Sequence, residues 1–365
     1  MLLFSVTILS SNRVTKLFRR KNEAILSNKL HANHLTILLI IVVIVGFRYN
    51  VGTDWLNYKS YYETQSGLDL YNYKQEYGFA FLMQLFQYYN ISYSGFLIIT
   101  ALVPWVLILK AHYTKYLPLI LFYLFTDGHL FISMNALRQF ISVGIFVYSI
   151  KFIINRKQLY YILTIIVASQ FHTSALILIS IYYLPYDRLE NNKIWIILYL
   201  ISFIYFLSPS IFDLLQSMVY YLITKIAILS HYRSYIELGR YNIQGIGGTG
   251  LGVIYRVIVT CIIMYYHKDI VNKYPNSKYY LIIMYIGAII VNLFFSIQLI
   301  QRVNYYLLII RPIALAYLYF TLHNSKNVFK KLIQTGLIFC YILLFAVEIY
   351  NSVAMCSPYN FAFTR

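Results

Sequence analysis

The feature that most restricts this chain is a series of long apolar runs separated by short segments rich in Lys and Arg. A helix needs about 20 apolar residues to cross a bilayer. Several runs are shorter and must tilt or borrow flanking residues, so we expect 11–13 crossings in an all-α polytopic membrane protein. The approximate ranges are 1–12, 33–47, 92–109, 116–134, 136–154, 159–171, 173–185, 194–208, 251–266, 279–298, 303–322 and 332–350.

The composition also indicates a membrane protein and argues against a soluble domain and against a nucleic-acid-binding protein. Hydrophobic residues make up 60% of the 365 residues and charged residues 12%, about half the share of a soluble domain. The net charge of +18 does not indicate nucleic acid, because the basic residues lie in short clusters rather than in one stripe or arm. No Cys or His spacing typical of a metal site occurs. We expect one integral membrane domain over 1–365, with the lipid bilayer as its surroundings.

The Lys and Arg clusters predict the orientation, because such clusters favour the cytoplasmic side. Segment 13–29 holds six basic residues and one acid, which places it inside and makes 48–76 an outer loop. The later clusters all fall inside only if 77–90 does not cross fully, so we predict a half-helix or interfacial helix there. The long segment 209–250 then faces outward, as an amphipathic helix followed by a Gly-rich loop that reads as a hinge.

The same topology gathers polar residues at the outer ends of the apolar runs, where a charged group needs a partner or a watery cavity. Arg138 and Asn135 share one helix face, and the planar fork of Arg suits phosphate oxygens. An Arg that snorkels to the interface is the alternative. Arg302 is placed like Arg138. Arg256 and Arg311 lie within apolar runs and could be structural or line a lipid groove. Pro312 follows Arg311 and should kink the helix of the run 303–322.

One imidazole and two carboxylates complete the set. An unperturbed His titrates at roughly pH 6.5, so His172 could transfer a proton. The alternative is that its ring is only capped by a helix-end carbonyl or a neighbouring hydroxyl. Asp54 and Glu76 could orient a sugar hydroxyl, pair with an Arg, or be solvated. Several Arg, one His and two acids on one side suit a diphosphate headgroup carrying sugars. Arg can neutralise a departing diphosphate without a metal or cofactor.

The chain resembles the EpsG/Wzy-type polysaccharide polymerases of bacterial envelopes, over roughly 33–320. A looser stretch around Arg302 adds to four matching motifs. The motifs are Arg48 to Tyr58 with Gly52-Thr53-Asp54, then Glu76-Tyr77-Gly78-Phe79, Asn135-Ala136-Leu137-Arg138-Gln139, and Phe171-His172-Thr173-Ser174-Ala175-Leu176.

The resemblance implies an enzyme of the bacterial plasma membrane that joins undecaprenyl-diphosphate-linked oligosaccharide repeat units at the outer face. Donor and acceptor would both be lipid-linked, and a chain-length regulator could be a partner. His172, Glu76 or Asp54 would act as base or orient the acceptor hydroxyl. The diphosphate or substrate ligands would be Arg48, Arg138, Arg302, Asn135 and Gln139, with Arg240 and Tyr241 of the outer segment as further candidates.

Two other functions fit part of the pattern. A flippase for the same lipid-linked units would also cross the membrane many times. Transporters, however, often carry internal repeats and polar residues near mid-membrane, whereas the polar residues here gather at one face and no repeat is evident. Another membrane transferase, a glycan ligase or an acyltransferase, is the third possibility. The sequence does not separate a ligase from a polymerase, because both need the same diphosphate site.

Overall fold

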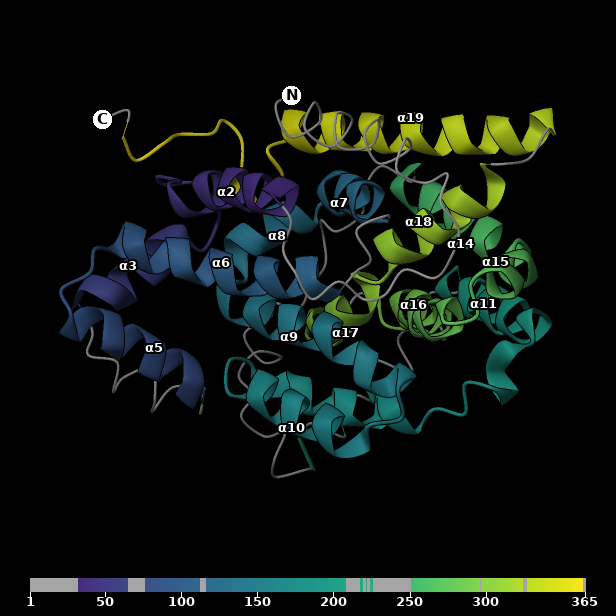
Figure 1. Ribbon diagram of the computed structural model, residues 1–365, viewed down its shortest axis with the longest axis horizontal. Coiled ribbons are helices and arrows are strands. Elements are labelled where there is room, and N and C mark those ends of the chain that lie inside the picture. The colour runs from purple at the N-terminus through teal and green to yellow at the C-terminus, as the bar shows by residue number, and fades with distance from the viewer. Residues whose placement is uncertain are drawn as a thin grey trace. The chain divides into compact units, whose positions relative to one another are not determined.

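The computed structural model describes residues 32–64, 76–111, 116–207, 251–295, 297–323 and 327–363, with five further positions between 217 and 225 (Figure 1). Across these ranges the chain is helical, and its β-structure is one isolated bridge between Arg48 and Phe361. The predicted all-α class is therefore confirmed. The first predicted run, 1–12, and nearly all of 209–250 lie outside the described residues.

The chain divides into two compact units, one of Met1–Leu184 with Leu322–Arg365 and one of Pro185–Thr321. The described helices of the first unit are α2 (Ala32–Gly46), α3 (Trp55–Thr64), α5 (Tyr77–Tyr88), α6 (Tyr93–Ala111), α7 (Leu117–Thr126), α8 (His129–Asn135), α9 (Leu137–Ile154), α10 (Gln158–Ser169), the 3-10 helix η1 (Thr173–Tyr183), α19 (Val328–Tyr350) and the 3-10 helix η4 (Val353–Met355).

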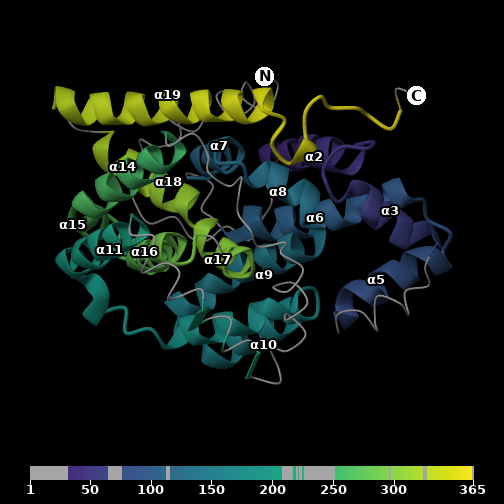
Figure 2. The same cartoon turned by 180° about the vertical axis from the view of Figure 1, so that it is seen from behind.

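Helix α6 packs against both α2 and α9 and forms the centre of the first unit (Figures 1 and 2). Two glycines permit this close packing. A Cβ on Gly144 of α9 would lie 2.6 Å from the Pro104 Cα atom of α6, and one on Gly46 would lie 2.7 Å from Ile98 Cγ1. Small residues at such crossings let helix backbones approach closely where lipid supplies no hydrophobic drive for helix association.

One predicted span is broken. The run 116–134 forms α7 and α8, which meet at an angle of 67°. Gly128 lies between them with φ +77°, a conformation that only glycine adopts at little cost. The single Gly128 therefore ends one helix and redirects the chain, and hydropathy alone did not reveal the break.

The second unit contains η2 (Arg188–Glu190), α11 (Asn192–Phe206), α14 (Leu251–Tyr265), α15 (His267–Lys273), α16 (Ser277–Leu293), α17 (Gln298–Leu308) and α18 (Arg311–Leu322). Helix α16 packs against α11 and α17. Helix α17 ends just before Arg311-Pro312, where we expected Pro312 to interrupt the run. Asn304 joins α17 to α16 by donating from Nδ2 to the Gly287 carbonyl oxygen, at 2.9 Å.

The helices are apolar and long enough for a multi-pass membrane protein. Among the described residues four helical segments meet the length and hydropathy of a span: Tyr93–Ala111, Leu137–Ile154, Ile300–Leu322 and Val328–Tyr350. The bent pair α7–α8 is a fifth, and six shorter apolar helices accompany them. Helix α5 has 12 residues, about 18 Å of rise, too short to cross, as expected for 77–90. The total of 11–13 crossings stays a prediction.

Candidate functional site

Two polar residues from distant parts of the first unit, Arg138 and His172, meet at the carboxylate of a third, Glu76. The Glu76 Oε2 atom accepts a hydrogen bond from Arg138 Nη1 at 2.6 Å. The Glu76 Oε1 atom lies 2.6 Å from His172 Nδ1. Each of these residues belongs to a different motif in the sequence. We call Glu76, Arg138 and His172 the carboxylate cluster.

A tight contact between two chain segments brings Glu76 beside His172. The backbone N–H groups of Gly78 and Phe79, at the start of α5, both donate to the Gln170 carbonyl oxygen, at 2.9 and 3.3 Å. A Cβ on Gly78 would lie 2.8 Å from the Gln170 Cβ atom. Only glycine fits this approach, which explains why Gly78 stands two residues after Glu76.

The end of α10 is held against the face of α9 that carries Arg138. Ser142, one turn after Arg138 on the same face, donates from Oγ to the Ala168 carbonyl oxygen at 2.9 Å. The same carbonyl accepts the His172 backbone N–H at 3.1 Å. Because Ser142 of α9 and the backbone of His172 bond the same carbonyl, the helix turn that carries Arg138 is held in place relative to His172.

Tyr58 of α3 contacts Arg138 from another side. Arg138 Nε donates to the Tyr58 hydroxyl at 3.4 Å, and the guanidinium lies 6.0 Å from the centre of the Tyr58 ring. The Tyr58 ring in turn packs edge-on against Phe79, with centroids 6.0 Å apart. The sequence motif contains Tyr58, but the sequence alone did not predict its contact with Arg138. The available signal was its position four residues after Asp54, about one helical turn.

The cluster is shielded, yet part of it reaches the surface. The Glu76 side chain is 4% exposed and that of His172 22%, while the Arg138 side chain is 16% exposed. An ionised carboxylate only accepts hydrogen bonds, so the short contact places the His172 proton on Nδ1. Neither Nε2 of His172 nor Nη2 of Arg138 forms a hydrogen bond to any described residue. These two atoms can serve a ligand.

Asn135 and Arg138 do not share one helix face as expected, because Asn135 ends α8 and Arg138 belongs to α9, with non-helical Ala136 between the helices. Asn135 instead anchors the loop after α2. Its Oδ1 accepts from Thr53 Oγ1 at 2.8 Å and from the Asp54 backbone N–H at 3.3 Å. Its Nδ2 donates to the Phe131 carbonyl oxygen at 2.9 Å. Gly52 has φ +101°, and a Cβ there would lie 2.9 Å from Asn135 Oδ1. The Gly-Thr-Asp motif thus forms a turn that closes around one amide.

The C-terminal segment pairs with the same loop. Backbone N–H groups of Tyr49 and Ala362 exchange hydrogen bonds with the carbonyls of Asn360 and Phe47, at 2.9 and 2.8 Å. Gly52 N–H donates to the Met355 carbonyl oxygen at 2.9 Å. Asn135 Nδ2 also reaches the Ala354 carbonyl oxygen, at 3.3 Å. Sequence reasoning gave this tail no role, because backbone pairing carries no residue signature.

Arg48 is the fully buried member of the predicted set. It is 1% exposed, and burial lowers the pKa of its guanidinium. Its Nη2 donates to the Met134 carbonyl oxygen at 2.8 Å and its Nη1 to the Val45 carbonyl oxygen. These two carbonyls belong to the last turns of α2 and α8, where helical acceptors lack intrahelical donors. Arg48 thus joins two helix ends.

The other predicted residues are dispersed. Gln139 is buried in α9, and Asp54 is half-buried at the turn before α3. Arg302 is exposed on α17 and belongs to the second unit. Arg240 and Tyr241 lie outside the described residues. Within the described ranges no group of three or more His, Cys, Asp or Glu side chains could hold a metal ion.

The apolar helices define a multi-pass membrane protein, in which one buried carboxylate contacts a histidine and an arginine. The chain belongs to the EpsG family, a Wzy-type polysaccharide polymerase family, whose family model matches residues 34–361. The match continues well past the Arg302 stretch and takes in most of the C-terminal segment that pairs with the loop after α2. No curated protein and no solved structure matches the chain.

Proposed function

We propose that this protein polymerises undecaprenyl-diphosphate-linked oligosaccharide repeat units into a surface polysaccharide, at the outer face of the bacterial plasma membrane. Membership of the EpsG family supports a polymerase role. The observation that carries the proposal at the level of residues is the Glu76 carboxylate, which contacts both His172 and Arg138 at 2.6 Å.

His172 is the general base in this proposal. Glu76 holds the proton on Nδ1, which leaves the Nε2 lone pair to accept a proton from the acceptor hydroxyl. A carboxylate in this position also fixes the orientation of the ring and stabilises the imidazolium that forms. Both oxygens of Glu76 already have partners, so Glu76 acts as a positioning residue rather than as the base.

Arg138 connects the base to the leaving group. Its Nη1 binds Glu76, and Nη2 of the same guanidinium can bind a diphosphate oxygen. Interactions aimed at developing charge in a shielded site are worth much more than in water. From the resemblance alone we add Arg302, Arg240 and Tyr241 as further ligands of the headgroup. Arg48 has a different role in this proposal, as the tie between the ends of α2 and α8.

The reaction balances without a cofactor. The acceptor hydroxyl oxygen forms a bond to the anomeric carbon of the donor sugar, and its proton passes to His172 Nε2. The bond between that carbon and the diphosphate oxygen breaks, and undecaprenyl diphosphate leaves with the electron pair. Arg138 stabilises the added charge on the departing oxygens, and the imidazolium releases its proton to water.

The topology of the first unit supports an outward-facing site. The tail after α19 pairs with the loop after α2, so both segments must lie on one side of the membrane. The Lys and Arg clusters independently assign both segments to the outer side. The carboxylate cluster adjoins that loop through Asn135 and Tyr58.

Deletion of the gene tests the proposal. Gel analysis of the envelope polysaccharide should show the ladder collapsing to a single repeat unit, and the wild-type gene should restore it. Loss of all surface units with accumulation inside the cell would instead identify a flippase. A ladder of unchanged length, lost only from its final acceptor, would identify a ligase.

A further inference from the structure

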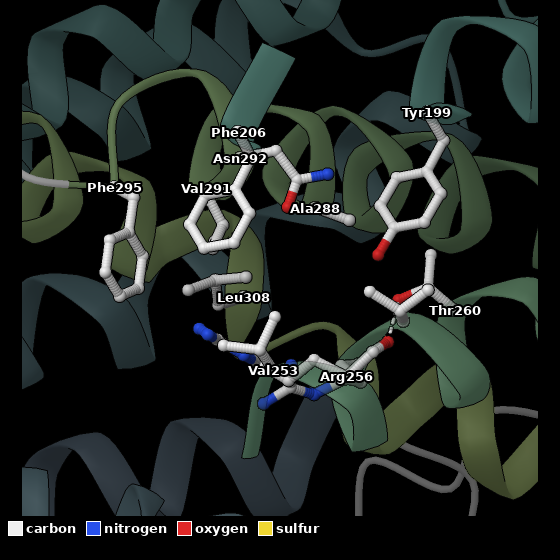
Figure 3. Close-up of a pocket in the computed structure, with 12 residues that line it drawn as sticks. Tyr199, Phe206, Val253, Arg256, Thr260, Ala288, Val291, Asn292, Phe295 and Leu308 are labelled. Atoms are coloured by element: carbon white, nitrogen blue, oxygen red, sulfur yellow. Dashed lines mark hydrogen bonds between the residues drawn. The ribbon is translucent and has the colours of Figure 1, made fainter. Parts of the chain in front are cut away.

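The second unit contains a pocket that none of the sequence motifs reaches. It lies among α11, α14, α16 and the junction of α17 with α18 (Figure 3), and its empty volume is about 350 Å³ including its open mouth. Every residue that lines it belongs to Pro185–Thr321. The pocket is thus a property of this unit alone.

One wall of the pocket is polar and buried. Tyr199, Thr260 and Asn292 are 2%, 3% and 7% exposed, and Figure 3 shows the Tyr199 hydroxyl directed toward Thr260. Asn292 Nδ2 donates to Ser202 Oγ at 3.0 Å. Buried amides and hydroxyls fixed in this way offer oriented dipoles to a ligand.

Two arginines give the pocket its charge. Arg256 of α14 and Arg311 at the start of α18 both line it, and none of its lining residues is acidic. Arg256 Nε donates to the Gly252 carbonyl oxygen at 3.3 Å, and its guanidinium carbon lies 5.6 Å from the centre of the Phe295 ring. The stem and ring hold the guanidinium in place, and the lining as a whole carries two positive charges.

The rest of the lining is apolar. Phe206, Val253, Leu308 and Phe295 contribute aromatic and aliphatic surface beside the two guanidinium groups. A pocket with cationic and apolar surface side by side fits a ligand that is anionic at one end and hydrocarbon at the other. An inorganic anion would leave the apolar part of the lining without a partner.

We propose that this pocket binds the diphosphate of a prenyl-diphosphate lipid, with the first part of the prenyl chain against the apolar lining. This inference rests on the proposed function, which supplies the lipid. A diphosphate monoester carries at least two negative charges and matches two arginines, whereas the phosphodiester of a common phospholipid carries one. Under the predicted topology the lining comes from the outer ends of α11, α14 and α16, where the released lipid must be held.

The test measures binding by the full-length protein in detergent micelles, with radiolabelled farnesyl diphosphate as the probe. Arg256→Gln and Arg311→Gln should each weaken binding about 10-fold, as loss of one charge-assisted contact requires. Lys268→Gln is the matched control, because Lys268 is an exposed cation of α15 outside the pocket. All measurements are repeated in an Arg138→Gln background, which removes binding at the carboxylate cluster.

Two further variants keep the test decisive if an Arg→Gln protein fails to fold. Val253→Trp fills the pocket without altering charge and should abolish binding, whereas Arg256→Lys keeps the charge and should retain most of it. Inorganic pyrophosphate should compete more weakly than farnesyl diphosphate, because it lacks the hydrocarbon.

Unchanged binding in the Arg256→Gln/Arg311→Gln double variant would overturn the assignment. Equal competition by phosphatidylglycerol would also overturn it and make the pocket a phospholipid site. Neither result depends on polymer formation. The wild-type protein could bind the probe through these arginines while deletion of its gene leaves the polysaccharide ladder intact. That combination would refute the proposed function and support the assignment of the pocket.

Discussion

The Nδ1 atom of His172 lies 2.6 Å from the Oε1 atom of Glu76, although 96 positions separate the two residues in the chain. The contact depends on Gly78 and Gln170, which bring the start of α5 against the end of α10. It joins two polar residues that are far apart in the sequence, and Arg138 contacts the other oxygen of the same carboxylate.

Replacement of the proposed base should abolish most of the activity. We expect His172→Gln to lower the rate of polymerisation about 100-fold or more, since general base catalysis contributes about that much. The measurement is the in vitro rate with purified protein and lipid-linked repeat units. His323→Gln, at an exposed histidine, is the control; a His172→Gln protein with the wild-type rate would remove this residue from the chemistry.

A single and a double variant test what the negative charge of Glu76 contributes to stability and to activity. Glu76→Gln removes the negative charge opposite the Arg138 guanidinium and should lower the free energy of unfolding by about 3 kcal/mol, as does loss of one charge from a buried pair. The double change Glu76→Gln/Arg138→Gln should recover most of the thermal stability but none of the activity. Recovery of activity in the double variant would show that the pair is structural only.

Gly78 gives a steric test. Gly78→Ala places a methyl group 2.8 Å from Gln170 Cβ and 3.1 Å from its carbonyl oxygen, so the start of α5 must move away and carry Glu76 with it. We expect loss of the polysaccharide ladder and destabilisation by about 1–3 kcal/mol. Gly336→Ala should have no effect, because nothing lies within 4 Å of a Cβ there. Equal ladders in both variants would contradict the packing argument.

Arg48 should behave as a structural residue. Lys lacks the planar fork of donors with which Arg48 bonds the Val45 and Met134 carbonyls, so we expect Arg48→Lys to lower stability by about 2 kcal/mol, seen as a lower melting temperature in detergent. Activity per folded molecule should change little. The reverse result, wild-type melting with lost activity, would return Arg48 to the diphosphate ligands.

His267 predicts how stability depends on pH. It is 1% exposed, burial lowers its pKa, and its Nδ1 lies 3.0 Å from the Tyr285 hydroxyl. The unfolded chain binds a proton below about pH 6.5, where folded His267 still resists it, so stability is lost as the pH falls through that range. Melting temperatures at pH 7.5 and 5.5 should differ less in His267→Phe, whereas His323→Gln should keep the wild-type difference.

The sequence predicted the long regular helices well, because hydropathy and length determine them. The runs 92–109 and 136–154 became Tyr93–Ala111 and Leu137–Ile154. Hydropathy did not reveal the break at Gly128, since one glycine hardly changes an average over many apolar neighbours. It also missed α3 in the segment after α2, because α3 is short and largely polar.

For the site, residue types were predictable and contacts were not. Arg138, His172 and Glu76 stood out because charge near lipid is costly. The sequence did not predict that Glu76 would occupy the centre, because that depends on Gly78 fitting against Gln170. Nor did charge distinguish Arg48, whose guanidinium bonds backbone carbonyls, from Arg138, whose guanidinium bonds the Glu76 carboxylate.

The pairing of residues 354–362 with the loop after α2 also bears on how the protein is made. The ribosome synthesises that loop early, and the residues that complete its hydrogen bonds follow α19 in the chain. Until the translocon has released α19, the turn around Asn135 lacks several of its backbone partners. This pairing must therefore form late, in a step that closes the chain on itself.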